Sequence, residues 1–398
     1  MSRERNERIL ERIPRPFREQ YFSLFRGPEP ETLHPDLYQR LIDVGTDKII
    51  EHMKRYNQRR RELIKKVRGK IEIRRLERDE KIAEARVVAS DAGNNGVDLR
   101  SAFIPLYASV ALTAEGWSIP HEPVFRAGEP TIWSDEFKAG DREALLAWKI
   151  QAEATIEAIQ RWKPKFVFFD GPIILSFWMT PTRSSTAGYK RDFEETIGKM
   201  VSLIYICHEM DIPLIGFVKR ARSVFLCKDK FGMKNMRDTA LLDLILRLGE
   251  YTDPVEMRGG LIETYKRKAV ELGIPKHETG ELMTFYSSYI RTGLTTPFRL
   301  EFSKYSLDRL EEAGTILFTT SEEEEGIPFS INEADRLTKV TTNISNIRTL
   351  MLYSKALDLV NKGEMQPEDL NLLILQHGEP WTIRDEGYIS SAVEEGGA

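Results

Sequence analysis

The sequence predicts an α/β fold in which helices flank a central sheet, with a helical extension before it. Two apolar runs, 87–93 and 166–172, each end in an aspartate followed by small residues. Such runs are typical of buried strands that present a carboxylate at one end. Helical periodicity lies between and after them, and alternating strands and helices indicate an α/β domain.

The first region, residues 1–84, is predicted to be helical and basic. Helix formers dominate from Asp36 onward, and no proline interrupts them. Basic residues greatly outnumber acidic ones between Lys54 and Lys81. This basic helix 54–81 is either a solvated helix with i,i+4 ion pairs or an arm that contacts phosphates, and both interpretations stay open.

From Arg86 the pattern changes to short strands separated by helices. The expected elements are strands 86–91 and 103–113, helix 141–162, strand 166–170, helix 189–210, strand 213–218 and helix 239–248. Further on we expect a strand pair 284–291 and 297–302, a strand 315–320, a solvated acidic loop 321–325, a helix 334–361 and a loose polar tail 386–398.

Composition excludes several classes of protein. The net charge is -4, so nucleic-acid binding can be argued only from local patches. The sequence contains neither a membrane-spanning run nor a signal peptide, which predicts a cytoplasmic protein. Only Cys207 and Cys227 are present, too few for a zinc knuckle, and we expect both to be ordinary thiols.

The acidic residues suggest a metal site. Two divalent cations close together need several carboxylates on rigid elements, because the cations repel each other. Asp91 and Asp170 end separate strands, and the helix between them carries Glu153 and Glu157 on an apolar stripe. A buried acid is costly unless a cation or donor compensates it. We therefore expect Asp91, Asp170 and one of the two glutamates to bind a metal.

A basic cluster follows the strand 213–218. Its first members, Lys219, Arg220 and Arg222, are candidates for binding a nucleic-acid backbone, although a surface position is the commoner explanation for a lysine such as Lys219. Phe225 and Phe231 are interleaved with the cluster. They either stack on bases or belong to the core.

These motifs, in this order, resemble those of the NurA nuclease family. The family's RNase H-like core places an Asp at the end of its first strand, a Glu on a helix and a second Asp at the end of the next strand. The matching stretches are Val88-Ala89-Ser90-Asp91, Ala152-Glu153-Ala154 and Phe168-Phe169-Asp170-Gly171. The family's spacing between the glutamate and the second aspartate favours Glu153 over Glu157.

The resemblance extends to a late motif but departs from it. The family's Tyr-Pro-x-x-Leu-x-x-Ala-His pattern corresponds to residues 327–335, where Ile327 replaces the tyrosine and Asp335 the histidine. An aspartate oxygen can still ligate Mg²⁺ or Mn²⁺. The family's usual Asp-Gly-Ser is also replaced here, by Asp91-Ala92-Gly93.

The resemblance implies an RNase H-like mixed sheet over 85–345, followed by a C-terminal helix and tail over 346–398. It implies a DNA nuclease in which Asp91, Glu153, Asp170 and Asp335 hold Mn²⁺ or Mg²⁺. It also implies a homodimer that processes double-strand breaks with a HerA-type ATPase. A catalytically degenerate DNA-binding or assembly subunit is the alternative, favoured by Ile327 and Asp335. A phosphoryl transferase is disfavoured because no Walker-type loop is present.

Overall fold

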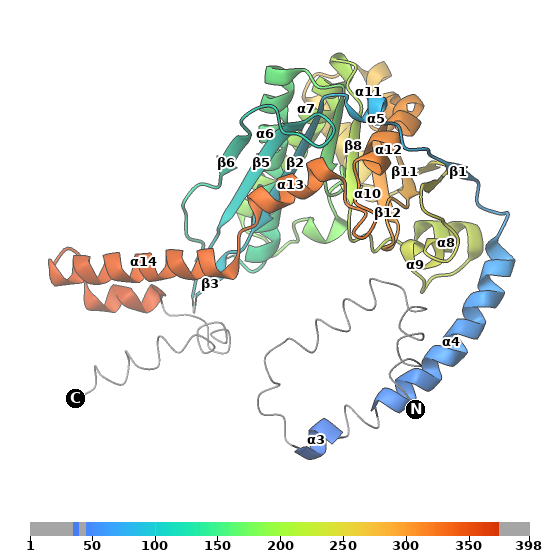
Figure 1. The fold of residues 1–398 in the computed structure, drawn as a ribbon. Coiled ribbons are helices and arrows are strands. Elements are labelled where there is room, and N and C mark those ends of the chain that lie inside the picture. Colours follow the sequence, from blue (N-terminus) through green and yellow to red (C-terminus); the bar gives the residue numbers. More distant parts are fainter. Residues whose placement is uncertain (1–34, 40–44, 100, 135, 374–398) are drawn as a thin grey trace.

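A large mixed sheet with helices on both faces forms the body of the protein (Figure 1). The structure, a computed structural model, describes residues 35–39, 45–99, 101–134 and 136–373. The expectations for residues 1–34 and for the tail 386–398 lie outside this part of the chain. The predicted α/β fold class, a mixed sheet flanked by helices, is confirmed.

The described sheet has ten strands in the order β1-β9-β11-β12-β8-β7-β2-β5-β6, with β10 paired to β11. The three central strands β2, β7 and β8 are parallel, and the other pairings are antiparallel. The strands are β1 (Ile73–Arg75), β2 (Val87–Asn94), β5 (Tyr107–Ala114), β6 (Val124–Ala127), β7 (Phe166–Asp170), β8 (Leu214–Val218), β9 (Glu250–Thr252), β10 (Val255–Glu256), β11 (Phe285–Ile290) and β12 (Phe298–Ser303). Strands β3 (Val97–Asp98) and β4 (Phe103–Ile104) form a separate pair.

Two helical layers cover the sheet. One contains α6 (Ala139–Trp162), α7 (Ala187–Glu209), α10 (Gly260–Glu271) and α11 (Lys276–Leu282); the other contains α5 (Glu80–Ala83), α12 (Leu310–Thr319) and α13 (Phe329–Thr338). Because side chains alternate along a strand, Val88 packs toward α6 and α7, whereas Val87 and Ala89 pack toward α12 and α13. The same alternation decides which layer each functional residue faces.

Two helices lie outside these layers and extend away from the body (Figure 1). They are α4 (Gly45–Val67), near the small helices α8 (Phe225–Phe231) and α9 (Asp238–Leu242), and α14 (Thr342–Asn361). The short helix α3 (Pro35–Gln39) precedes α4, and 3-10 turns cover Phe177–Met179, Lys304–Arg309 and Pro367–Leu373. None of the described helices combines the length and apolar character needed to cross a bilayer.

Most of the predicted elements are present, with several corrections. The predicted strand 315–320 is wrong, because this segment belongs to α12. All residues from Ala313 to Thr319 are buried, and a helix that is apolar all round has the same short apolar run as a buried strand. The predicted basic helix 54–81 ends at Val67, and the chain then forms β1 at the edge of the sheet.

The remaining differences concern boundaries. The strand predicted over 103–113 is split into β4 and β5, because Pro105 cannot donate a ladder hydrogen bond. The helix predicted over 334–361 is two helices, α13 and α14, and the one predicted over 239–248 is the shorter α9. The predicted pairing of 284–291 with 297–302 is confirmed by the antiparallel ladder between β11 and β12.

A close backbone approach joins β2 to the end of α13. A Cβ atom placed on Gly93 would lie 2.1 Å from the carbonyl oxygen of Thr338, so the site has no room for a side chain. This contact fixes the distance between the end of β2 and the last turn of α13.

We predict that Gly93→Ala lowers the free energy of unfolding by about 1–3 kcal/mol, because the strand and the helix must separate to admit the methyl group. Urea denaturation measures the difference. Gly140→Ala is the matched control, since no atom lies within 4 Å of a Cβ at that position in α6. Equal stability of the Gly93 variant and the wild type would contradict the proposed contact.

Candidate metal centre

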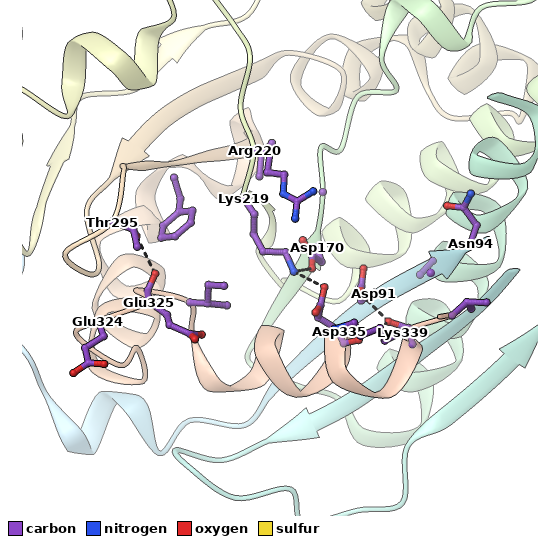
Figure 2. Close-up of a pocket in the computed structure, with 18 residues that line it drawn as sticks. Asp91, Asn94, Asp170, Lys219, Arg220, Thr295, Glu324, Glu325, Asp335 and Lys339 are labelled. Atoms are coloured by element: carbon purple, nitrogen blue, oxygen red, sulfur yellow. Dashed lines mark hydrogen bonds and ion pairs between the residues drawn. The ribbon is translucent and has the colours of Figure 1, made fainter. Parts of the chain in front are cut away.

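Three aspartates converge at one edge of the central strands (Figure 2). Asp91 lies in β2, Asp170 is the last residue of β7, and Asp335 lies on α13. Each offers a carboxylate oxygen, and these oxygens lie within 4.8 Å of one another. The structure therefore brings together three of the four predicted ligands, although they are far apart in the sequence.

The sheet explains this convergence. Strands β2 and β7 are parallel, with Ser90 opposite Phe169, so Asp91 and Asp170 occupy neighbouring positions just beyond. Alternation places both carboxylates on the face that α13 covers, below Ala89 and Phe168 respectively. Helix α13 packs its apolar side, Ile331 and Ala334, on this face and thereby carries Asp335 to the strand ends.

Lys219 lies at the centre of this acidic group. It comes directly after β8, in step with Ile215 and Phe217, and so faces the same layer. Its Nζ lies 2.7 Å from Asp170 Oδ2 and donates a hydrogen bond to Asp335 Oδ1, also at 2.7 Å (Figure 2). The ammonium group therefore neutralises part of the charge that the aspartates concentrate here.

Burial and mutual repulsion shift the protonation of the group. Burial raises the pKa of Asp170 to about 8, with the charge of Asp91 adding to the shift and Lys219 opposing it. Burial also raises the pKa of Asp91. For Lys219, burial acts to lower the pKa, but the carboxylates of Asp170 and Asp335 outweigh it and raise the pKa overall. The raised pKa values of the two aspartates mean that added positive charge, either a proton or a cation, stabilises the site.

Thr338 is a residue of the site that the sequence analysis missed. Its hydroxyl donates a 2.7 Å hydrogen bond to Asp91 Oδ2. It lies three residues after Asp335, so both side chains project from the same side of α13. This three-residue spacing is the only feature of the sequence that could have identified Thr338. It becomes informative only when Asp335 is known to belong to the site.

The structure does not bring Glu153 to the aspartates. Its carboxylate lies 3.6 Å from Lys199 Nζ and 3.9 Å from Arg126 Nη1, on the opposite side of the sheet from α13. Glu157 also pairs with Arg126, at 2.9 Å. The apolar stripe that suggested these glutamates is not the face of α6 that packs on the strands.

The face of α6 that meets the strand ends carries Gln151. Its Nε2 donates to the backbone oxygens of Ser90 and Asp170, at 2.9 and 3.1 Å. Residue 153 is displaced from residue 151 by about 200° around a helix, which explains why Glu153 points elsewhere. An amide thus holds β2 and β7 together at the place where the sequence predicts an acid.

An open cavity of about 980 Å³ gives access to the aspartates. Its lining includes Lys219, Arg220 and Ile327. The acidic loop predicted to be solvated contributes Glu324 and Glu325 to the same cavity (Figure 2). Arg222, the third predicted DNA-binding residue, lines a neighbouring cavity instead.

The donor set fits a hard divalent cation. Three carboxylates supply only oxygen ligands, which Mg²⁺ and Mn²⁺ prefer. Asp170 Oδ2 is buried and accepts no well-directed hydrogen bond, although Lys219 lies close to it. Lys219 compensates part of the negative charge and leaves carboxylate oxygens for a divalent cation, so Asp91, Asp170 and Asp335 form a candidate metal centre.

Known structures share this fold. The NurA nuclease from Sulfolobus solfataricus is 14% identical, with a TM-score of 0.59, and the match covers 84% of this chain and 100% of that one. A structure of NurA bound to dAMP and manganese is 10% identical, with a TM-score of 0.51, covering 77% of this chain and 94% of that one. The comparison with curated proteins gives no match.

A mixed sheet that gathers carboxylates at the ends of two parallel strands suits a metal-dependent nuclease. The NurA domain matches residues 85–340, which is more than half of the sequence. The chain belongs to the NurA family, as the order of the motifs predicted.

We predict that Asp170→Asn stabilises the metal-free protein at alkaline pH. Because the pKa of Asp170 is raised from 3.8 to about 8 on folding, its contribution to stability is fully present below pH 4 and is lost as the pH rises through 8. The variant should gain a few kcal/mol over the wild type at pH 9 and little at pH 4, since one pKa unit corresponds to about 1.4 kcal/mol. Urea denaturation in EDTA across this range measures the difference, and parallel pH profiles would contradict it.

Proposed function

We propose that this protein is a divalent-metal-dependent nuclease that hydrolyses DNA. The observation that carries the proposal is the convergence of Asp91, Asp170 and Asp335, whose oxygens lie within 4.8 Å of one another beside an open cavity. Metal-assisted phosphodiester hydrolysis uses a cluster of carboxylates of this kind to hold the cation. Family membership and the manganese-bound NurA structure support the same conclusion.

The three aspartates would hold Mn²⁺ or Mg²⁺. Such an ion supplies Lewis-acid activation of water and stabilises the charge that develops on the leaving oxygen. Thr338 fixes the orientation of the Asp91 carboxylate through its hydrogen bond. Lys219 limits repulsion between Asp170 and Asp335 and places a positive charge where a phosphate would approach. Glu153 has no part in this proposal, because its carboxylate pairs with Lys199 and Arg126.

DNA is the proposed substrate. Lys219 and Arg220 line the cavity that contains the aspartates, and the exposed Arg222 lies two residues further on. These three basic side chains suit a phosphate backbone that passes over the metal centre. The net charge of -4 makes this local cluster necessary, since the whole protein does not attract an anion.

The biological role that we propose is the processing of double-strand break ends by a cytoplasmic homodimer, with a HerA-type ATPase as partner. Family membership is the main support. Helix α14 adds to it with five apolar side chains that are exposed in the single chain: Ile344, Ile347, Leu350, Met351 and Leu357. The two extended helices α4 and α14 lie outside the matched domain, which supports the proposed division into residues 1–84, 85–345 and 346–398, although α14 begins at Thr342, before the last of these boundaries.

A catalytically degenerate DNA-binding or assembly subunit is the second candidate. Three observations favour it. Ile327 offers no hydrogen bond, Gln151 rather than an acid meets the strand ends, and an ammonium group already contacts two of the aspartates. Measurements of metal binding and of DNA cleavage distinguish a degenerate subunit from an active nuclease.

We predict that Asp91→Ala reduces Mn²⁺-dependent release of nucleotides from an end-labelled DNA duplex by at least about a hundredfold, since loss of an outer partner alone typically costs 10–100-fold. Gel analysis of the products measures the rate. Glu153→Gln is the matched control and should retain most of the activity, because its carboxylate faces Lys199 and Arg126. Undiminished cleavage by the Asp91→Ala variant would contradict the assignment of the three aspartates as the catalytic metal site.

We also predict that Mn²⁺ stabilises the wild-type protein against thermal unfolding, by about 2.7 kcal/mol when its concentration is 100 times the dissociation constant. Asp335→Asn should weaken this stabilisation, because it removes one of three carboxylates. Differential scanning calorimetry with and without Mn²⁺ measures both effects. A wild-type melting temperature that does not respond to millimolar Mn²⁺ would favour the degenerate subunit.

A further inference from the structure

A second cavity, of about 870 Å³, lies beside the metal centre and differs from it in character. Its lining is mainly apolar and includes four aromatic side chains: Trp148, Phe177, Trp178 and Phe225. Phe177 is 78% exposed and Trp178 53% exposed, although such large apolar groups are usually covered. The cavity lies in the size range of pockets that bind small organic groups.

Three arginines accompany these aromatic rings. Arg220, Arg222 and Arg258 all line the cavity and are exposed. None of the three forms a hydrogen bond or ion pair with another residue in the described part of the chain. A further arginine, Arg299, is neutralised by an ion pair with the buried Glu301. The cavity therefore offers flat apolar surfaces and unpaired positive charges to one ligand.

The two cavities are neighbours and share part of their lining. Val218 and Arg220 line both of them. Trp148 lines the aromatic cavity and, together with Asp91 and Asp170, a smaller third cavity. A ligand that spans both sites would present a phosphate to the aspartates and its next group to the aromatic rings.

We propose that this cavity binds unpaired nucleobases of the DNA strand whose phosphate lies at the metal centre; the inference rests on the proposed function. Bases stack on aromatic side chains regardless of sequence, and the accompanying phosphates pair with arginines. Bases inside a duplex are stacked on each other and cannot enter, so the strand must be single or frayed at this point. The cavity thus binds the nucleotides next to the scissile bond.

The test measures binding in EDTA, where cleavage cannot occur, by fluorescence anisotropy. The probes are a labelled oligodeoxythymidylate and an abasic oligomer of the same length, with the same phosphates and no bases. The wild type should bind the thymidylate about tenfold more tightly, because stacking on one aromatic side chain is worth about that factor. Trp178→Ala should lose most of this preference and keep its affinity for the abasic oligomer. Phe177→Ala provides a second variant at the same cavity.

Trp117→Ala is the matched control. Trp117 is also exposed, at 47%, but it follows β5 at the end of the sheet opposite Asp91, since Ala114 pairs with Val87. This variant should keep the full preference for bases. Equal affinity of the wild type for the two oligomers, or an equal loss in Trp117→Ala and Trp178→Ala, would overturn the base site.

A parallel cleavage assay with Mn²⁺ separates the two proposals. A protein that cuts DNA but binds both oligomers equally would refute the base site and leave the nuclease intact. A protein that neither binds nor cuts DNA would refute both.

Discussion

Repulsion between three carboxylates, held together by the sheet and relieved by one ammonium group, is the constraint on which this molecule depends. Parallel pairing of β2 and β7 leaves Asp91 and Asp170 no freedom to move apart. Helix α13 adds Asp335 because its apolar side must cover the same face. Folding therefore concentrates negative charge in a partly buried place, and Lys219 reduces the cost without cancelling it. The remaining charge is what a divalent cation would neutralise.

The two faces of the sheet differ in function: one packs the larger core, and the other carries the candidate metal centre. The layer formed by α6 and α7 supplies the larger core, and Gln151 ties two central strands together from that side. The layer that contains α13 carries the ionisable groups of the candidate metal centre. Because neighbouring side chains on a strand point in opposite directions, a shift of one residue in register would move Asp91 and Asp170 into the apolar layer. The register is thus as important to the chemistry as the identity of the ligands.

Much of the fold and part of the site could be predicted from the sequence. Strand β7 begins and ends where its apolar run does, and Asp91, Asp170 and Asp335 were found from short motifs in the expected order. The prediction of Glu153 as a ligand is wrong, because an apolar stripe on α6 does not reveal which side of the helix the sheet will bury. The strand expected over 315–320 was wrong for a related reason, since a helix enclosed on all sides has no polar face to mark its period.

The position of Lys219 illustrates what a sequence cannot give. A lysine directly after a strand has no local feature that separates a surface residue from one enclosed by acids. Its role depends on residues more than a hundred positions away on α13. Thr338 is similar, since its partner Asp91 lies 247 positions earlier. Such contacts are decided by how distant elements pack and not by neighbouring residues.

The anchoring of α14 has a mechanical consequence. Its first turns are tied to the loops around the end of β2, where Ser345 donates to the backbone oxygen of Asn95 and Arg348 to that of Pro105. Only three residues separate this helix from Thr338. Helix α14 and the aspartate cluster are therefore both attached to β2 and to the residues that directly follow it. A molecule that binds along α14 is therefore held at a fixed distance and orientation relative to the aspartates.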